Sequence, residues 1–525
     1  MIPGLQLALA LALPTATAMP GACGTPALLP TMPPPRPITL PARALEDRLT
    51  RDLYGVPNAR ESEHFVLRWG NQRSVQSADV DTMLDALEQS WSVEVDAMGH
   101  PAPETTEAYK LNVYIGDTGD GAPDSYGAAG YYYPDGEGYP MIVLAPSVVA
   151  DPSYGVLTVA HEFYHAIQWS TYQYDYGDGA VGAWYWEATA SWIEVEVYPG
   201  YPEYAGFLFG YALLPQLPVD FFDYPDTGAL QEYHQYGAFI FPQYLSEFEG
   251  GREILRNTWV EPQTDSRDPL QNIDAELRAR GSDLPAAFTA FAARNATWDY
   301  ADGDVFDAYV QGYGEYYPAY DFGVAARESL SPDGDLGWRG VEPGLLPQRY
   351  GYNLVEVQLE AGVEAVRVEM QADDTGSEGS PAGWGLTVVA EGAGAPSYHP
   401  VSLDASGEGS VELAVEPEAT LWLVAAAWSD ARRDGETFAW QYRVAESDGG
   451  GGDGGDGGDG GDGGSGTDGA DGGSGTDGAD GVVSGDEERG KVSSCASRSG
   501  SPSGLLALSG AALWVRRRKG RRTGA

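Results

Sequence analysis

The sequence predicts an α+β protein in which a mixed sheet with helices precedes an all-β sandwich. Two observations indicate this arrangement. Near the start, an apolar strand at 65–69, apolar residues at helical spacing over 80–98 and an alternating strand at 110–115 follow one another, which predicts a sheet covered by helices. Further on, residues 345–446 alternate apolar and charged side chains between glycine and proline turns. This pattern is typical of an antiparallel sandwich, here of roughly six to eight strands.

Acidic side chains dominate the composition. The chain of 525 residues carries 78 acidic and 30 basic side chains, a formal net charge of -48. Phosphate groups are bound by clustered Lys and Arg, so this balance argues against nucleic acid and anionic membrane surfaces as partners. The length is sufficient for two or three domains with cores of their own.

The N-terminal segment has the features of an export signal. An apolar run in residues 1–18 ends in small residues, which predicts a signal peptide cleaved after Ala18, although no Lys or Arg precedes the run. The alternative is a buried apolar N-terminal helix. Residues 19–60 are rich in proline, so we expect a spacer or pro-segment there. Cys23 and Cys495 both lie outside the segments that are expected to be globular, so no disulfide framework is predicted.

The strongest chemical signal in the chain is the run from His161 to His165, which has the pattern HExxH. On a helix, positions four apart lie one above the other, so His161 and His165 can both bind one metal ion while Glu162 faces the same cleft. The alternative is a helix that merely carries two surface histidines. Zinc in a hydrolase usually has three protein ligands and one water, so a third ligand is required.

Candidates for the third metal ligand lie downstream of His165 in the sequence. Gln168 and Thr171 occupy the positions where the metzincin pattern requires Gly and His, which excludes that group. A second amphipathic helix follows, in which Glu187 and Glu194 share one stripe and Glu196 lies close to it. The two stripe residues are some 10 Å apart along the axis at 1.5 Å per residue, so they cannot share one ion.

HExxH on one helix and a glutamate on the next resembles the gluzincin group of zinc metallopeptidases. The resemblance extends from about Lys110 to about Leu245. It implies a zincin-like metallopeptidase domain, a mixed sheet plus active-site helices, which we expect over residues 61–336. It also implies Zn²⁺ as the cofactor, with His161, His165 and Glu187 as its ligands.

The same resemblance suggests further roles in the site. Glu162 is expected to be the general base. Independently of the resemblance, Ser191 lies one turn after Glu187 on the predicted helix, so we expect it to support a ligand histidine. In gluzincins a Tyr or His near the third helix donates to the oxyanion, and His234 and Tyr236 are both candidates for this role. The strand beside the cleft, which pairs with the substrate backbone in this group, is expected at 128–133. An ordinary tyrosine-rich hairpin there is the alternative.

The C-terminal residues predict a disordered linker followed by a sorting tail. Residues 447–494 consist largely of Gly and Asp in repeats, so we expect a disordered linker. Residues 495–525 contain a cysteine, a short apolar stretch and an arginine cluster, which resembles the C-terminal sorting tails of exported myxobacterial proteins. That resemblance implies anchoring to the membrane or cell envelope. The apolar stretch is shorter than the roughly 20 residues that a relaxed span requires.

These observations together predict a secreted zinc endopeptidase that is anchored at the cell surface and acts on proteins or peptides. The alternative is a surface adhesin, in which the sandwich binds a partner and the zincin domain is catalytically inactive. An adhesin would have no need of Glu162, so hydrolysis that depends on this residue separates the two hypotheses.

Overall fold

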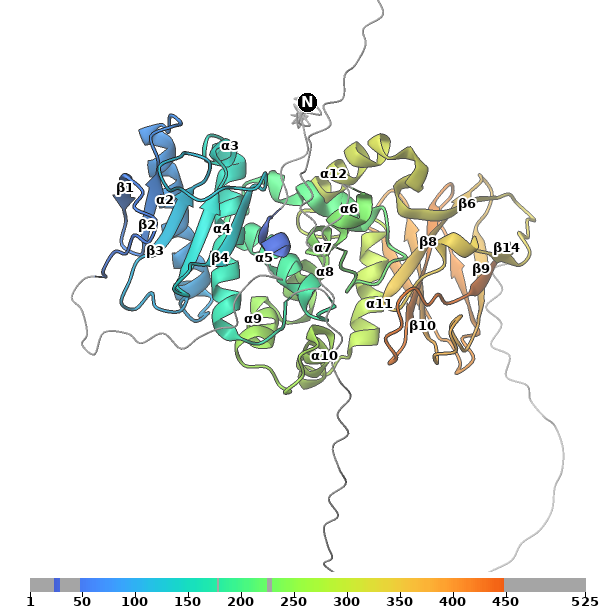
Figure 1. The fold of residues 1–525 in the computed structure, drawn as a ribbon. Coiled ribbons are helices and arrows are strands. Elements are labelled where there is room, and N and C mark those ends of the chain that lie inside the picture. The colour runs from blue at the N-terminus through green and yellow to red at the C-terminus, as the bar shows by residue number, and fades with distance from the viewer. Residues whose placement is uncertain (1–22, 29–47, 177–178, 224–228, 448–525) are drawn as a thin grey trace, which may run out of the picture. The chain divides into compact units, whose positions relative to one another are not determined.

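A computed structural model of the chain describes residues 23–28, 48–176, 179–223 and 229–447 (Figure 1). The described residues confirm a mixed α+β architecture with a β-rich C-terminal part. Among the described residues, none of the helices combines the length and apolarity needed to cross a membrane. The predicted signal peptide (1–18), nearly all of the linker (447–494) and the sorting tail (495–525) lie outside the described residues.

A five-stranded sheet forms the first layer of the N-terminal part, in the order β1-β2-β3-β5-β4. Its strands are β1 (Asn58–Glu61), β2 (Phe65–Trp69), β3 (Leu111–Ile115), β4 (Gly130–Pro134) and β5 (Pro140–Leu144). The three inner strands run parallel and are buried almost throughout, as expected for strands covered on both faces. β4 is an edge strand: among the described strands it pairs only with β5, antiparallel, and α4 packs against it.

The predicted HExxH segment forms α4 (Pro152–Thr171), a buried helix that packs against α5 (Ala183–Val197). Pro152 occupies the first turn, and the Asp151 side chain caps the helix by accepting bonds from the backbone N–H groups of Ser153 and Tyr154. The helix ends where Tyr172 adopts a left-handed conformation. Both helices are buried nearly all round, because α5 lies between α4 and the helices that follow.

The remaining described helices are each shorter than α5, and several of them, including α2, α7 and α8, pack against α4 or α5. The α-helices are α1 (Thr25–Leu28), α2 (Ser77–Ser90), α3 (Pro146–Val149), α6 (Leu208–Ala212), α7 (His234–Gly237), α8 (Ile240–Tyr244), α9 (Arg252–Val260), α10 (Pro269–Ala279), α11 (Leu284–Asn295) and α12 (Gly303–Tyr316). The π-helices are η2 (Trp91–Ala97) and η5 (Leu245–Gly250), and the 3₁₀ turns are η3 (Pro202–Phe207), η4 (Leu230–Tyr233), η6 (Pro318–Gly323) and η7 (Pro343–Leu345).

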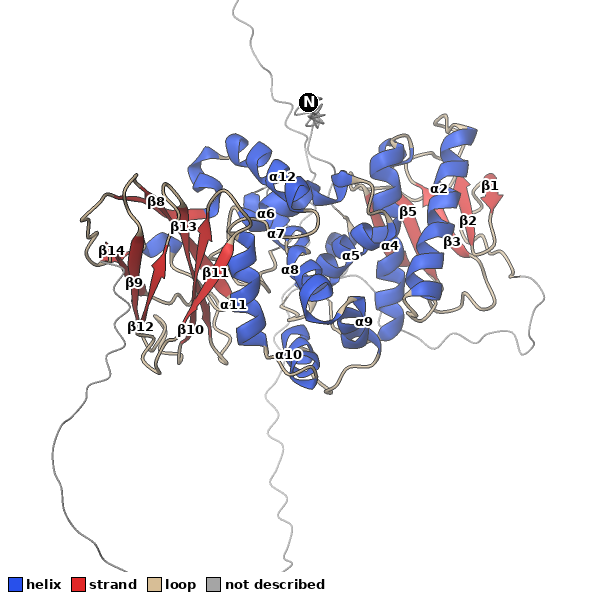
Figure 2. Ribbon diagram, turned by 180° about the vertical axis from the view of Figure 1, so that it is seen from behind, coloured by secondary structure: helices blue, strands red, loops and turns tan. Residues whose placement is uncertain are grey.

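The C-terminal part is a sandwich of a five-stranded and a four-stranded sheet, with orders β11-β10-β13-β8-β6 and β12-β9-β14-β7 (Figure 2). The strands are β6 (Val324–Leu330), β7 (Arg339–Gly340), β8 (Gly351–Leu359), β9 (Ala365–Ala372), β10 (Gly383–Glu391), β11 (Ser397–Val401), β12 (Gly409–Ala414), β13 (Thr420–Trp428) and β14 (Trp440–Glu446).

The sandwich begins earlier than the predicted boundary at residue 345. β6 lies inside the segment assigned from the sequence to the metallopeptidase domain, yet it pairs in parallel with β8. The helical part and the sandwich also share a core, because α11 packs on β10 and β13 and the Asn295 side chain donates to the Tyr352 hydroxyl at 3.1 Å.

Candidate metal centre

Four side chains with metal-binding atoms meet between α4, α5 and β4. They are His161 and His165 on α4, Glu187 on α5 and Cys23, which lies two residues before α1. One potential ligand atom from each lies within 4.8 Å of those of the others, and all four residues are buried. Although α1 stands at the start of the described chain, it packs against β4.

The separations fit a tetrahedral ion. The Nε2 atoms of His161 and His165 lie 3.3 and 3.6 Å from the Glu187 carboxylate oxygens, and the Cys23 sulfur lies 3.5 Å from the His165 Nε2. Nitrogen and oxygen ligands about 2.0 Å from a tetrahedral zinc ion are roughly 3.3 Å apart, and a sulfur at about 2.3 Å widens this to roughly 3.6 Å. The four residues therefore match the donor set and the size of a zinc site.

The orientation of His165 is fixed by Gln168. The amide nitrogen of Gln168 donates to the Trp186 carbonyl and to the Thr189 hydroxyl, both at 2.9 Å, so its oxygen is left to accept. This oxygen lies 2.6 Å from the Nδ1 of His165, which must therefore donate. A neutral His165 consequently presents the lone pair of Nε2 to Glu187, as a metal ligand does.

Glu194 holds His161 in the equivalent way. Its carboxylate accepts from the His161 Nδ1 at 2.9 Å, which directs the Nε2 toward Glu187. The Tyr176 hydroxyl donates to the other oxygen of Glu187. Each histidine thus has a partner on its outer nitrogen, the arrangement that orients histidines in metal sites.

The buried carboxylates and histidines of the cluster shift one another's pKa values. Burial alone would lower the pKa of His161, but Glu187 and Glu194 outweigh it and raise that pKa to about 10. Burial alone would raise the pKa of Glu187, but His165 and His161 lower it to about 2. Burial, with Glu162 and Glu187 adding to it, raises the pKa of the Cys23 thiol. The carboxylates and histidines of the cluster therefore stabilise one another's charged forms, and the buried carboxylates Glu162 and Glu187 oppose ionisation of the Cys23 thiol.

Glu162 lies beside the cluster and under the edge strand. It is buried, and burial raises the pKa of its carboxyl group. One oxygen accepts from the Thr25 hydroxyl at 3.3 Å, and the other has no hydrogen-bond partner among the described residues. Gly130 of β4 leaves room for this side chain, since a Cβ there would lie 3.0 Å from the Glu162 Cγ. The edge strand expected at 128–133 is therefore adjacent to the proposed base.

The structure separates the two oxyanion candidates. The Tyr236 ring lies 6.3 Å from that of His161, centroid to centroid, and its hydroxyl donates to the Cys23 carbonyl at 3.3 Å. His234 instead packs in the core against Tyr211 and Phe221. Burial lowers the pKa of His234 to about 3, against a weak interaction with the Phe221 backbone. Tyr236 is therefore placed at the cluster and His234 is not.

Two residues of the centre were not expected from the sequence. Cys23 was assigned to a spacer outside the globular part, because the prolines around it indicate extended chain. Glu194 was expected to have no part in metal binding, and Ser191 was expected to support a histidine. The Ser191 hydroxyl has no partner among the described residues, and Glu194 and Gln168 take the supporting role. Glu194 is too far along the helix to share the ion with Glu187, but it reaches the outer nitrogen of a ligand.

A family model described as "Family of unknown function (DUF6055)" matches residues 41–446. No curated protein matches the chain. Similar solved structures include the pre-peptidase C-terminal domain of a collagenase from Bacillus anthracis, with 9% identity over 23% of this chain and 94% of that chain, at a TM-score of 0.15. A GH115 4-O-methyl-alpha-glucuronidase covers 51% of this chain and 40% of its own at 12% identity and a TM-score of 0.13. TM-scores this low carry no argument about fold or function.

Proposed function

We propose that this chain, which belongs to the DUF6055 family of unknown function, is a zinc-dependent endopeptidase with a zincin-like catalytic domain. One observation carries the proposal. The Nε2 atoms of two oriented histidines face the carboxylate of Glu187 across separations that suit a tetrahedral ion. Together with the Cys23 sulfur, these atoms lie within 4.8 Å of one another in a buried site, and the donor set of nitrogen, carboxylate oxygen and sulfur is one that zinc binds.

The residues around the ligands supply the remaining chemistry. Bound zinc polarises a substrate carbonyl and lowers the pKa of a water molecule. Glu162, buried beside the ligands, accepts the proton of the attacking water and passes it to the leaving amine. The Tyr236 hydroxyl donates to the oxygen on which negative charge develops.

The edge strand offers a way to hold the substrate. Among the described strands β4 pairs with β5 alone, and the face of β4 at Gly130 lies next to Glu162. An extended peptide can add to such an edge through main-chain hydrogen bonds, which favours cleavage within polypeptides of varied sequence.

The proposal is tested by metal content and hydrolysis together. The protein should hold one equivalent of zinc, and Glu187→Gln should remove it, whereas Glu196→Gln on the same helix should not. Hydrolysis of casein or a peptide library is best measured with Cys23→Ala present, so that the sulfur cannot compete for the metal. A full equivalent of zinc with Glu187→Gln, or equal hydrolysis with and without Glu162→Gln, would contradict the proposal.

A further inference from the structure

We infer that residues 23–25 are a tethered inhibitor of this site, in which the Cys23 sulfur is the fourth metal ligand. The inference rests on the proposed function and adds a regulatory ligand to it. Three kinds of contact support it: the sulfur meets the metal-binding atoms, the backbone follows the substrate-binding edge, and both proposed catalytic side chains are engaged.

The sulfur completes the ligand set. It lies 3.5 Å from the His165 Nε2 in a group where two histidines and one carboxylate supply three ligands. When it binds, the S–H bond breaks, the proton leaves to solvent, and a sulfur–metal bond replaces the bond between the metal and water. A hydrolytic zinc site needs that fourth position for water, so the bound sulfur stops hydrolysis.

The backbone of the segment lies where an extended substrate is proposed to bind. The Gly24 N–H donates to the Gly130 carbonyl at 2.8 Å, and the Tyr132 N–H donates to the Thr25 hydroxyl at 2.9 Å. Both partners belong to the edge strand β4. The segment therefore occupies the strand edge that the proposed function gives to the substrate.

Both catalytic side chains are engaged by the same three residues. The Thr25 hydroxyl donates to Glu162, which accepts the proton of water in the proposed reaction. The Tyr236 hydroxyl donates to the Cys23 carbonyl, as it would to the carbonyl of a bound peptide. The segment thus imitates a substrate except that it places sulfur at the metal.

Gly24 allows the close approach. A Cβ at this position would lie 2.7 Å from the Ala128 Cβ, closer than such atoms come, so a side chain would push the segment away from β4. Gly24→Ala therefore displaces the segment without altering a metal-binding atom. It forms a matched pair with Cys23→Ala, and Cys495→Ser serves as the control for a general effect of losing a thiol.

The first experiment observes the ligand directly. The whole chain, retaining Cys23, is loaded with Co²⁺ in place of zinc. We expect a near-ultraviolet sulfur-to-cobalt charge-transfer band in the wild type and in Cys495→Ser. Cys23→Ala should lack the band yet keep a full equivalent of cobalt. Absence of the band from the wild type would overturn the inference. So would loss of the metal in Cys23→Ala, since the sulfur would then belong to a permanent structural site.

The second experiment measures release. Cys23→Ala and Gly24→Ala should each hydrolyse peptides at least about tenfold faster than the wild type, because a blocked site acts only in the fraction of molecules where it is free. Circular dichroism and metal content check that both variants are folded. Equal rates in wild type and Cys23→Ala would overturn the inhibitory role while leaving the peptidase intact. No hydrolysis in any folded, metal-loaded variant would overturn the peptidase and therefore the inhibition, and the cobalt band would still report on the sulfur ligand.

Discussion

Buried Asn353 in the sandwich and buried Glu94 and Glu162 in the N-terminal part are opposite cases of hydrogen bonding. In the sandwich, the buried Asn353 side chain donates to the Leu345 carbonyl at 2.7 Å and accepts from the Trp440 indole at 2.9 Å. In the N-terminal part, both carboxylate oxygens of the buried Glu94 lack a partner among the described residues, and so does one oxygen of Glu162. An unpaired buried carboxylate destabilises the fold, so the residues that keep one are candidates for chemistry.

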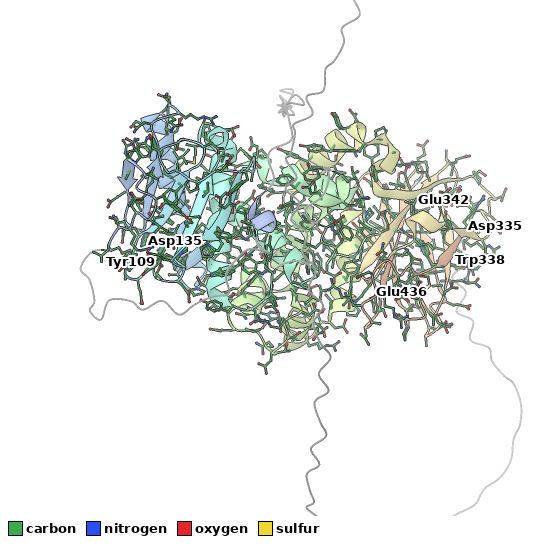
Figure 3. All side chains as sticks on the ribbon, in the orientation of Figure 1. Tyr109, Asp135, Asp335, Trp338, Glu342 and Glu436 are labelled. Carbon is green, nitrogen blue, oxygen red and sulfur yellow. The ribbon has the colours of Figure 1, made fainter. Side chains whose placement is uncertain are left out.

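Ionised pairs follow the same division. The sandwich keeps them near its surface, where Asp335 pairs with Arg443 and Arg367 pairs with Glu412 at 3.2 Å. Figure 3 shows Asp335 and Trp338 at one end of the sandwich. The N-terminal part instead buries glutamates and histidines together at the candidate metal centre. The proposed metal centre thus concentrates charge in the interior, whereas these two sandwich pairs keep it at the surface.

The largest expected effect is on the rate of peptide hydrolysis when Glu162 is substituted. With Cys23→Ala present, Glu162→Gln should reduce the rate of peptide hydrolysis by about 10² to 10⁴, the usual contribution of a general base. The amide keeps the shape of the side chain and cannot accept the proton. Zinc content should be unchanged, as measured by elemental analysis. Glu391→Gln, an exposed sandwich residue that accepts from the Trp422 indole, is the control and should retain full activity.

The buried histidine beside Glu94 should give the N-terminal part a dependence on pH. Burial lowers the pKa of His100 from 6.5 to about 4, opposed by a hydrogen bond to the Glu94 carbonyl, so the unfolded chain binds more protons between these values. The stabilisation that neutral His100 contributes is therefore fully present above the pKa of this residue in the unfolded chain. It is lost as the pH falls toward the pKa of His100 in the folded protein. Between about pH 7 and pH 5 the loss should be about 2 kcal/mol.

Urea unfolding of wild type and His100→Gln at the two pH values measures this term. The variant should lack this contribution, so the free energy of unfolding should depend on pH differently in the two proteins. Glu94 acts in the opposite direction, because burial raises its pKa and favours the folded state at low pH. Parallel slopes in wild type and variant would show that His100 is not the group responsible.

Glu194 tests whether the outer partners of the histidines matter. Glu194→Gln should weaken zinc binding by about 10- to 100-fold, because the amide holds the His161 Nδ1 less firmly. Glu187→Gln should weaken it far more, since a ligand is lost. Competition with a chromogenic chelator measures both affinities. Equal affinities for Glu194→Gln and wild type would remove Glu194 from the centre.

These residues also show what the sequence can reveal. Spacing predicted that His161, Glu162 and His165 share a helix face, whereas Glu187 followed from the resemblance to gluzincins. The structure places these four residues close together. Alternation predicted the sandwich strands, because one face of each strand is buried. Contacts between distant segments leave no such periodic signal. Cys23 reaches the centre from a proline-rich segment 138 positions before His161, and nothing in its neighbours indicates that approach.

Substitution of the buried amide of Asn353 in the sandwich should lower stability without affecting the proposed metal centre. Asn353→Ala leaves the Trp440 N–H and the Leu345 carbonyl without their partner, which should cost about 1 to 3 kcal/mol of unfolding free energy. Zinc affinity and hydrolysis in the folded protein should be unchanged. Denaturant unfolding and metal titration on the same sample measure both. A change in zinc affinity would mean that the two parts are coupled more closely than their shared core around α11 suggests.

The smallest effect is expected at Ser191, which separates a polar group that is merely buried from one that serves the centre. It lies on α5 between Glu187 and Glu194, and its spacing from them gave the sequence-based expectation that it supports a ligand histidine. Its hydroxyl has no partner among the described residues, while Gln168 and Glu194 already occupy the outer nitrogens of both histidines. Ser191→Ala should therefore leave zinc affinity unchanged, and stability should stay equal or rise slightly because an unpaired buried hydroxyl is removed. Gln168→Leu is the matched comparison on the facing helix and should weaken zinc binding, since it frees the His165 ring to turn. If Ser191→Ala lowered zinc affinity as much as Gln168→Leu does, the hydroxyl would have to reach the centre in solution, and the division of roles between Ser191 and Glu194 would be reversed.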